Sequence, residues 1–289
     1  MQRDYDVIVI GSGPGGEGAA MKCAKAGKRV AVIEAFFEVG GNCTHKGTIP
    51  SKALRQIIQR KPNWLKFQDA DYQTLLRHSQ IVIEAQVKLR RGFYESNDVD
   101  IIEGFARFTH PHTVEVTRAG GQKRSFSADH FVLASGSRPY RPEDVNFTHP
   151  RICDSDTILK LKDTPKSLTI YGAGVIGCEY ASIFRGLGMK VNLINTRAQL
   201  LSFLDDEIID ALAYHLREMG VRLDHSEKYT AVEADDRGVT LHLESNKQIR
   251  SDYLLWANGR TGNSDKLGLE VLNITPDARG SIPVNEQFQ

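Results

Sequence analysis

The sequence predicts an α/β protein built on two copies of a βαβ unit. The main observation is a pair of glycine-rich hexapeptides with the spacing G-x-G-x-x-G, at residues 11–16 and 172–177. Each hexapeptide follows a β-rich run typical of a buried parallel strand and opens a helical stretch. A second β-rich run follows each helix, at residues 29–33 and 190–194. This context predicts two Rossmann-like dinucleotide-binding domains.

The glycines of each hexapeptide have different expected tasks. The first makes a tight turn, the second lets the backbone approach a pyrophosphate, and the third lets the helix pack on the strand. The helix N-terminus then presents unpaired N–H groups and partial positive charge to the phosphates. The alternative is a pair of glycine-rich turns without a ligand. The glycines expected at the two pyrophosphates are Gly11, Gly13, Gly16, Gly172, Gly174 and Gly177.

The ends of the two second strands differ chemically. Counting from the first glycine, 34 − 11 = 23 reaches Glu34, and 195 − 172 = 23 reaches Asn195. Glu34 can accept hydrogen bonds from a ribose and would repel a 2′-phosphate. Asn195 is neutral and is followed by Thr196 and Arg197, whose guanidinium could pair with a 2′-phosphate. The second site could therefore take NAD, NADP or both, although Arg197 could equally be an ordinary surface arginine.

Composition excludes several functional classes. The chain has 289 residues, of which 40% are hydrophobic and 25% charged, and a net charge of +1, which argues against a nucleic-acid binder. No apolar run approaches the roughly 20 residues that span a bilayer, and the N-terminus leads directly into a strand. We therefore expect no membrane segment, no signal peptide and a cytoplasmic location. The four cysteines form no C-x-x-C pair, so neither a metal site nor a disulfide framework is predicted.

The stretch between the two units predicts a change of structure. Helical patterns near residues 51–60 and 74–97 precede short β-like runs, which we interpret as a small antiparallel meander inserted in the first domain. A proline-punctuated segment at residues 138–150 suits a crossing into the second domain. The predicted boundaries are 1–150 for the first domain, 151–267 for the second, and 268–289 for a return to the first.

Residues 40–52 carry the most specific motif. Their sequence, GGNCTHKGTIPSK, resembles the segment G-G-x-C-x-x-x-x-C-x-P-x-K of the two-dinucleotide-binding-domain flavoprotein reductases, which include glutathione reductase and dihydrolipoamide dehydrogenase. The resemblance covers essentially the whole chain and implies FAD on the first hexapeptide and NAD(P) on the second. Cys43 stands where the family has its first redox cysteine, whereas Thr48 replaces the second.

This replacement changes the expected chemistry. A lone thiol cannot close the intramolecular disulfide cycle that passes electrons to a second substrate. Together with residues 176–184, the pattern resembles the transhydrogenases of this family, which implies hydride exchange between NADPH and NAD through FAD. The alternatives are a disulfide reductase of the dihydrolipoamide dehydrogenase type and a nucleotide-binding fragment without turnover.

The resemblance also implies individual roles. Lys52, Glu179 and Cys43 are the candidate catalytic residues, and Lys52 is expected to pair with Glu179 close to flavin N5. Cys43 is either a small packing residue or a thiolate charge donor to the flavin, and His45 is expected to be structural. Further cofactor contacts are expected at Glu34, Ala35, Gly40, Gly41, Asn42, Cys43, Lys52, Gly136, Asn195, Thr196, Arg197 and Gly259.

Family members continue past a segment like residues 280–285 into more of the flavin domain and a C-terminal dimerisation domain. We therefore expect this chain to be a fragment of a longer protein that forms a homodimer or a higher homo-oligomer. Its expected partners are nicotinamide nucleotides, with neither nucleic acid nor membrane.

Overall fold

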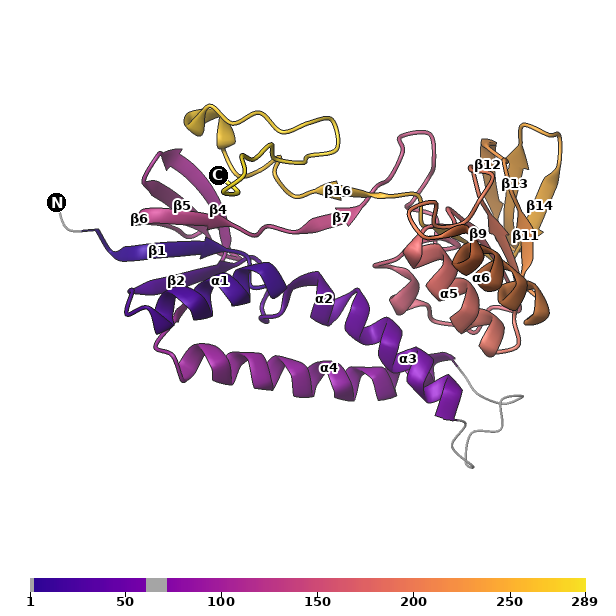
Figure 1. Ribbon diagram of the computed structural model, residues 1–289, viewed down its shortest axis with the longest axis horizontal. Coiled ribbons are helices and arrows are strands. Elements are labelled where there is room, and N and C mark those ends of the chain that lie inside the picture. The colour runs from indigo at the N-terminus through magenta and orange to yellow at the C-terminus, as the bar shows by residue number, and fades with distance from the viewer. Residues whose placement is uncertain (1–2, 61–71) are drawn as a thin grey trace. The chain divides into compact units, whose positions relative to one another are not determined.

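The computed structural model of the protein describes residues 3–60 and 72–289, and it divides into two compact units (Figure 1). Unit 1 consists of Met1–Ile49, Ile81–Arg138 and Arg260–Gln289. Unit 2 consists of Pro50–Gln80 and Pro139–Gly259. Most of unit 2 is therefore inserted within the chain of unit 1, and each unit has its own parallel strands and helices. The predicted α/β class with two Rossmann-like units is confirmed.

Unit 1 is built on a six-stranded mixed sheet. Its order is β3-β2-β1-β6-β5-β4, with β1 parallel to both β2 and β6 and with β5 antiparallel to both β4 and β6. The strands are β1 (Tyr5–Ile10), β2 (Val30–Glu34), β3 (Asp100–Glu103), β4 (Phe105–His110), β5 (Thr113–Thr117) and β6 (Lys123–Leu133). The first half of β6 pairs with β5 and the second half with β1. The predicted meander is thus continuous with the main sheet.

Both faces of the parallel part of this sheet are buried, as its uniformly apolar strands require. Ile8 and Ile33 face one cluster of buried side chains, and Val9 and Val32 face another. The second cluster includes residues of α1 (Pro14–Lys25) and Tyr94 of α4 (Tyr72–Glu95). The remaining helices of this part of the chain are α2 (Gly41–His45) and α3 (Thr48–Arg60).

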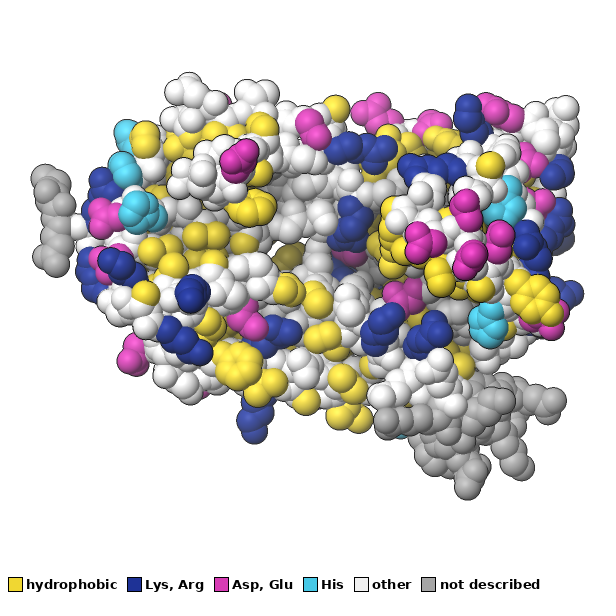
Figure 2. Space-filling model, in the orientation of Figure 1, with side chains coloured by type: hydrophobic (Ala, Val, Ile, Leu, Met, Phe, Trp, Pro, Cys, Tyr) yellow, Lys and Arg dark blue, Asp and Glu magenta, His cyan; other side chains and the backbone are white. Residues whose placement is uncertain are grey.

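Helix α4 has apolar side chains on more than one face. Ile83 and Val87 are buried, whereas Ile81, Leu89 and Phe93 are exposed. Apolar side chains are accordingly visible along this helix in Figure 2. An amphipathic pattern alone therefore does not identify which apolar side chains of this helix are buried.

Unit 2 contains a five-stranded parallel sheet in the order β11-β10-β9-β15-β8. Helix α5 (Val175–Gly186) connects β9 to β10, and α6 (Asp206–Glu218) connects β10 to β11. The strands are β8 (Ile152–Asp154), β9 (Ser167–Tyr171), β10 (Lys190–Ile194), β11 (Arg222–Asp224) and β15 (Tyr253–Trp256). Strands β7 (Ser137–Pro139) and β16 (Arg260–Gly262) form a separate two-stranded sheet. Two short 3-10 helices are η1 (Ile158–Lys160) and η2 (Leu269–Leu272).

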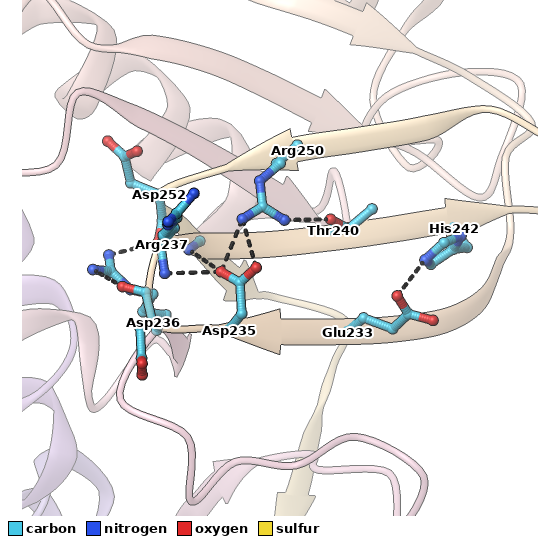
Figure 3. A network of polar contacts seen from close by, with 10 residues as sticks. Glu233, Asp235, Asp236, Arg237, Thr240, His242, Arg250 and Asp252 are labelled. Carbon is cyan, nitrogen blue, oxygen red and sulfur yellow. Dashed lines mark hydrogen bonds and ion pairs between the residues drawn. The ribbon is translucent and has the colours of Figure 1, made fainter.

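A three-stranded antiparallel sheet completes unit 2, formed by β12 (Tyr229–Asp235), β13 (Gly238–Leu243) and β14 (Gln248–Ser251). Figure 3 shows Arg250 of β14 reaching across β13 to Asp235. Arg250 Nη2 donates to both carboxylate oxygens of Asp235, each at 2.8 Å. Asp235 also accepts hydrogen bonds from the backbone N–H groups of Arg237 and Gly238. One carboxylate therefore ties the β12–β13 turn to the third strand.

The unit boundaries differ from the predicted domain boundaries of 150/151 and 267/268. Val145 and Phe147 pack in unit 2, so the crossing occurs at Arg138 and Pro139. Leu267 packs in the core of unit 1, so the return begins at Arg260. Residues 50–80 also belong to unit 2, where the described part includes Leu54 in the core. The helical periodicity of this stretch indicates that it has a buried face, but it does not indicate which of the two units that face packs against.

Close approach of helix to strand depends on the third glycine of each hexapeptide. A Cβ atom built at Gly16 would lie 1.8 Å from the carbonyl oxygen of Gly11, and one at Gly177 would lie 1.9 Å from that of Gly172. Neither distance is compatible with a methyl group, so the helix would have to move away from the strand.

We predict that Gly16→Ala lowers the free energy of unfolding by about 3 kcal/mol, because the new methyl group overlaps the backbone of Gly11. Gly18→Ala on the same helix is the matched control, since a Cβ there meets nothing within 4 Å. It should raise stability by about 0.5–1 kcal/mol, as replacement of a helical glycine does. Urea unfolding followed by circular dichroism measures both changes. Equal stability of the two variants would contradict the steric argument.

Candidate functional site

The first glycine loop forms an open backbone cradle at the N-terminus of α1. Gly11 has φ of +104°, and a Cβ there would lie 2.2 Å from the carbonyl oxygen of Ala134. At Gly13, in contrast, the only heavy atom within 4 Å of a built Cβ is the Cα of Gly41, at 3.9 Å. The side of Gly13 that a side chain would occupy is therefore open, next to the N–H groups that begin α1, which are of the kind that can bind an anion.

Glu34 lies at the end of β2 and is buried against this loop. Its Oε2 accepts hydrogen bonds from the backbone N–H of Ser12, at 3.0 Å, and from the Ser12 hydroxyl. Its Oε1 accepts one from the N–H of Phe36 at 3.0 Å, and the N–H of Gly40 donates to the Ser12 hydroxyl oxygen at 2.9 Å. A carboxylate has about four acceptor positions, so capacity for a ribose hydroxyl remains. Glu34 thus shapes the loop in addition to any contact with a ligand.

Residues 40–43 lie directly against the first glycine loop. Gly40 and Gly41 have φ of +115° and +58°, and a Cβ at Gly41 would lie 2.7 Å from the Cα of Gly13. The Asn42 side-chain amide donates to the carbonyl oxygen of Ser137. Cys43 is half-buried on α2. The structure therefore places Gly41 beside the Gly13 backbone and Gly40 beside Ser12.

His45 and Gly136 have contacts within unit 1. His45 Nε2 lies 2.9 Å from the carbonyl oxygen of Val39, which agrees with the expected structural role. Gly136 has φ of +68°, and its carbonyl oxygen accepts the N–H of Asn263 at 3.0 Å. Ala35 is half-buried directly after β2. This hydrogen bond ties Gly136 to the last segment of unit 1, Arg260–Gln289.

The second glycine loop repeats the geometry of the first. Gly172 has φ of +108°, and a Cβ there would lie 2.6 Å from the carbonyl oxygen of Ala257. A Cβ at Gly174 would meet nothing within 4 Å, which leaves the N-terminus of α5 open. Val175 follows with 59% of its surface exposed. The N–H groups that begin α5 are likewise of the kind that can bind an anion.

The Asn195 side chain stabilises the turn after β10. Its Nδ2 donates to the carbonyl oxygen of Gln199 at 2.8 Å, and its Oδ1 accepts the N–H of Arg197 at 3.2 Å. The buried amide is therefore committed to contacts within the chain. Arg197 is exposed and donates to the Ser202 hydroxyl at 2.9 Å, and Thr196 is half-buried.

Gly259 lies at the end of unit 2 with φ of +99°, a backbone conformation that residues other than glycine rarely adopt. Its carbonyl oxygen accepts the N–H of Tyr140 at 3.1 Å. The predicted cofactor residues of the second site are thus distributed over the ends of several strands.

Lys52 and Glu179 meet within unit 2. Lys52 Nζ lies 2.7 Å from Glu179 Oε1, and the exposed side-chain fractions are 60% and 17%. Arg55, one turn further along α3, donates to the Ser182 hydroxyl on α5 at 3.0 Å. Two polar contacts therefore connect α3 and α5 across 127 residues of sequence.

Two cysteines outside the motif have the properties of packing residues. Burial raises the pKa of Cys153 to about 12 and that of Cys178 to about 11. Both thiols are therefore protonated at neutral pH, and Cys178 Sγ contacts the carbonyl oxygen of Ala173 at 3.5 Å. Residues 3–60 and 72–289 contain no cluster of three or more potential metal-ligating His, Cys, Asp or Glu side chains.

Comparison with known proteins assigns the family. The family model described as "Pyridine nucleotide-disulphide oxidoreductase" matches residues 5–289. The chain belongs to the pyridine nucleotide-disulphide oxidoreductase family. This membership accounts for the paired glycine loops and for the motif at residues 40–52. Within the described part of the chain, no helix of this family member is long and apolar enough to span a bilayer.

Several curated relatives are similar over the whole chain. A "Soluble pyridine nucleotide transhydrogenase" of Pseudomonas aeruginosa (strain LESB58) is 53% identical over 300 residues, covering 99% of this chain and 64% of the relative. A protein with the same name from Vibrio parahaemolyticus is 54% identical over 294 residues, with coverage of 99% and 63%. The chain thus spans somewhat less than two thirds of these curated relatives.

Solved structures of the family show the same fold. The Cu(II) complex of the HOCl-induced flavoprotein disulfide reductase RclA from Escherichia coli matches with a TM-score of 0.88 at 28% sequence identity. The match covers 100% of this chain and 64% of that one.

Sequence reasoning did not identify Ser12, because its hydrogen bonds to Glu34 and Gly40 depend on the folded loop. We predict that Ser12→Ala lowers the free energy of unfolding by about 1–2 kcal/mol, since Glu34 and the Gly40 N–H lose a buried partner. Ser125→Ala, at an exposed position of β6, is the matched control and should change stability by less than about 0.5 kcal/mol. Denaturant unfolding of both variants compares them. A neutral Ser12→Ala would show that the network does not stabilise unit 1.

Proposed function

We propose that this chain carries the dinucleotide sites of a flavin-dependent transhydrogenase, which transfers hydride from NADPH to NAD. The observation that carries the proposal is the combination of two glycine cradles with a motif in which Thr48 replaces a second cysteine. The curated relatives named soluble pyridine nucleotide transhydrogenase support it. The proposal includes a cytoplasmic location and a homo-oligomeric full-length form.

FAD is proposed at the first cradle. The N–H groups at the start of α1, the glycines of residues 11–16 and the segment 40–43 would hold its pyrophosphate and extend toward its ring. Glu34 would accept a ribose hydroxyl with its remaining acceptor capacity. When bound, the flavin accepts hydride from one nicotinamide and passes it to another.

Lys52 and Glu179 are proposed to set the electrostatics at the flavin. A lysine cation favours a reduced, anionic flavin, and an adjacent carboxylate both orients the ammonium and stabilises its charge. The 2.7 Å contact between the two side chains supports this pairing. Cys43 is proposed as a small residue that packs beside the ring.

NAD(P) is proposed at the second cradle, with the start of α5 at its pyrophosphate. Gly172, Gly174 and Gly177 would contact the phosphates, and the turn that Asn195 stabilises would present Thr196 and Arg197 to the adenosine end. Arg197 supplies a guanidinium that suits a 2′-phosphate, and no carboxylate occupies position 195 to repel one.

Disulfide reduction requires a second thiol that this segment lacks. Thr48 cannot form a disulfide with Cys43, and the buried Cys153 and Cys178 are protonated thiols whose pKa is raised. A second nicotinamide is therefore the simplest electron acceptor.

The direct test is an anaerobic titration. Addition of NADPH to the flavin-loaded protein should bleach the flavin absorbance, and subsequent addition of NAD should restore it. Recovery with NAD and no reaction with lipoamide supports the transhydrogenase. Recovery only with lipoamide would instead establish a disulfide reductase, and failure to bind FAD would leave this chain as a nucleotide-binding segment.

We predict that Lys52→Met slows flavin reduction by NADPH by about a hundredfold, because the developing negative charge loses its cation. FAD affinity should change little. Arg55→Met is the matched control, because it removes a neighbouring cation of the same helix, and its reduction rate should stay close to that of the wild type. Stopped-flow measurement of the half-reaction tests both. An unchanged rate in Lys52→Met would remove this lysine from the proposed mechanism.

A further inference from the structure

The segments that follow β10 and β11 lie side by side. The N–H of Asn195 donates to the carbonyl oxygen of Asp224 at 2.8 Å, and the N–H of Ser226 donates to that of Arg197 at 3.1 Å. These backbone hydrogen bonds continue the strand pairing past the ends of the strands, so His225 is brought beside the turn that contains Arg197. Ligands of open α/β sheets bind outside the carboxyl ends of the strands, where this turn lies.

Both ring nitrogens of His225 face hydrogen-bond donors. Nδ1 lies 3.3 Å from Asn195 Nδ2, and Nε2 lies 3.5 Å from Nη2 of Arg217 on α6. The Asn195 amide cannot turn to offer its oxygen without giving up its contacts with Arg197 and Gln199. A neutral imidazole accepts at only one nitrogen. The group of Asn195, Arg217 and His225 therefore has more donors than acceptors, a condition that an anion relieves.

The acidic side chains near His225 already have cationic partners. Asp224 contacts Arg222 at 2.9 Å and Lys247 at 3.4 Å. Glu227 contacts Lys247 at 2.7 Å, and this hydrogen bond is the main reason that its pKa is lowered. Burial, followed by the charge of Arg217, lowers the pKa of His225, while Asp224 acts in the opposite direction. Arg197 and Arg217 are exposed, so the charge offered to a ligand at this edge is positive.

We infer that Arg197, Arg217 and His225 together bind the 2′-phosphate of NADP(H), and that His225 makes the preference for the phosphorylated nucleotide stronger as pH falls. The inference rests on the proposed function, because it assigns the adenosine end of the same nucleotide site. Arg197 was expected from the end of the second strand. Arg217 lies on α6 and His225 directly follows β11, so only the folded chain brings them to the turn that contains Arg197.

The direction of the pH effect follows from linkage. In the free protein, burial and the charge of Arg217 lower the pKa of His225, so its protonated form is disfavoured. A phosphate beside the ring favours the protonated form, so binding the phosphate takes up a proton at pH values near the ordinary pKa of histidine. The contribution of His225 to the affinity for the phosphorylated nucleotide must then rise as pH falls. The affinity for an unphosphorylated nucleotide has no such dependence on His225.

The test compares adenosine 2′,5′-bisphosphate with 5′-AMP by isothermal titration calorimetry, because neither probe reduces a flavin. We expect the wild type to prefer the bisphosphate, and the preference to be larger at pH 6 than at pH 8. Arg217→Ala should reduce the preference by about tenfold, which corresponds to loss of one charged hydrogen bond. His225→Gln should reduce it at pH 6 and abolish proton uptake by the ring. Both variants should bind 5′-AMP like the wild type.

Two controls separate this site from general charge effects. His215→Gln removes an exposed histidine of α6, and Arg237→Ala removes an exposed arginine of the β12–β13 turn. Both should keep the wild-type preference. Because a phosphate monoester itself titrates near pH 6, the decisive quantity is the difference between the wild type and His225→Gln across the pH range. Thermal unfolding of each variant verifies that it is folded.

The possible failures are distinguishable. If the wild type binds 5′-AMP but has no preference for the bisphosphate, or if both Arg217→Ala and His225→Gln keep that preference, the inference is overturned and the proposed nucleotide site stands. If the wild type binds neither probe, the nucleotide site of the proposed function fails as well.

Discussion

The close approach of a helix to a strand at two glycines is the constraint on which both units depend. At Gly16 and Gly177, a single methyl group would overlap the carbonyl oxygen of the first glycine of the loop. Because the helix can lie this close, its first N–H groups point across the loop toward the carboxyl ends of the parallel strands. The two glycine cradles are therefore a direct result of backbone packing, and in unit 1 the Glu34 and Ser12 side chains also shape the loop.

Much of the fold could be predicted because this constraint leaves a local signature. Glycine spacing, β-rich runs and the residue at the end of the second strand, Glu34 or Asn195, all lie within about 30 residues of one another in each βαβ unit, which is the scale on which the fingerprint is defined. The pairing of Lys52 with Glu179 was implied by family resemblance, and the structure brings the two side chains together. The role of each predicted cofactor residue stays a proposal.

Other features depend on contacts that no local pattern contains. Ser12 occupies a variable position of the hexapeptide, and only the folded loop brings its hydroxyl between Glu34 and Gly40. Residues 50–60 carry an amphipathic helical pattern, yet the pattern is the same whichever sheet the helix covers. His225 follows a three-residue strand and has no motif around it. In each case the deciding partner is distant in sequence.

The order in which unit 1 can assemble follows from its three separate segments. The N–H of Phe108, on β4, donates to the carbonyl oxygen of Leu267 at 2.7 Å, and Leu269 is buried in the same core as Ile8 and Ile33. A nascent chain leaving the ribosome therefore holds β1 to β6 for more than a hundred further residues before this core can close. During that interval Pro139–Gly259, the larger part of unit 2, is synthesised. The closing contacts of unit 1 are among the most non-local of the chain, a class of contact that slows folding and prolongs the exposure of apolar strands to chaperones.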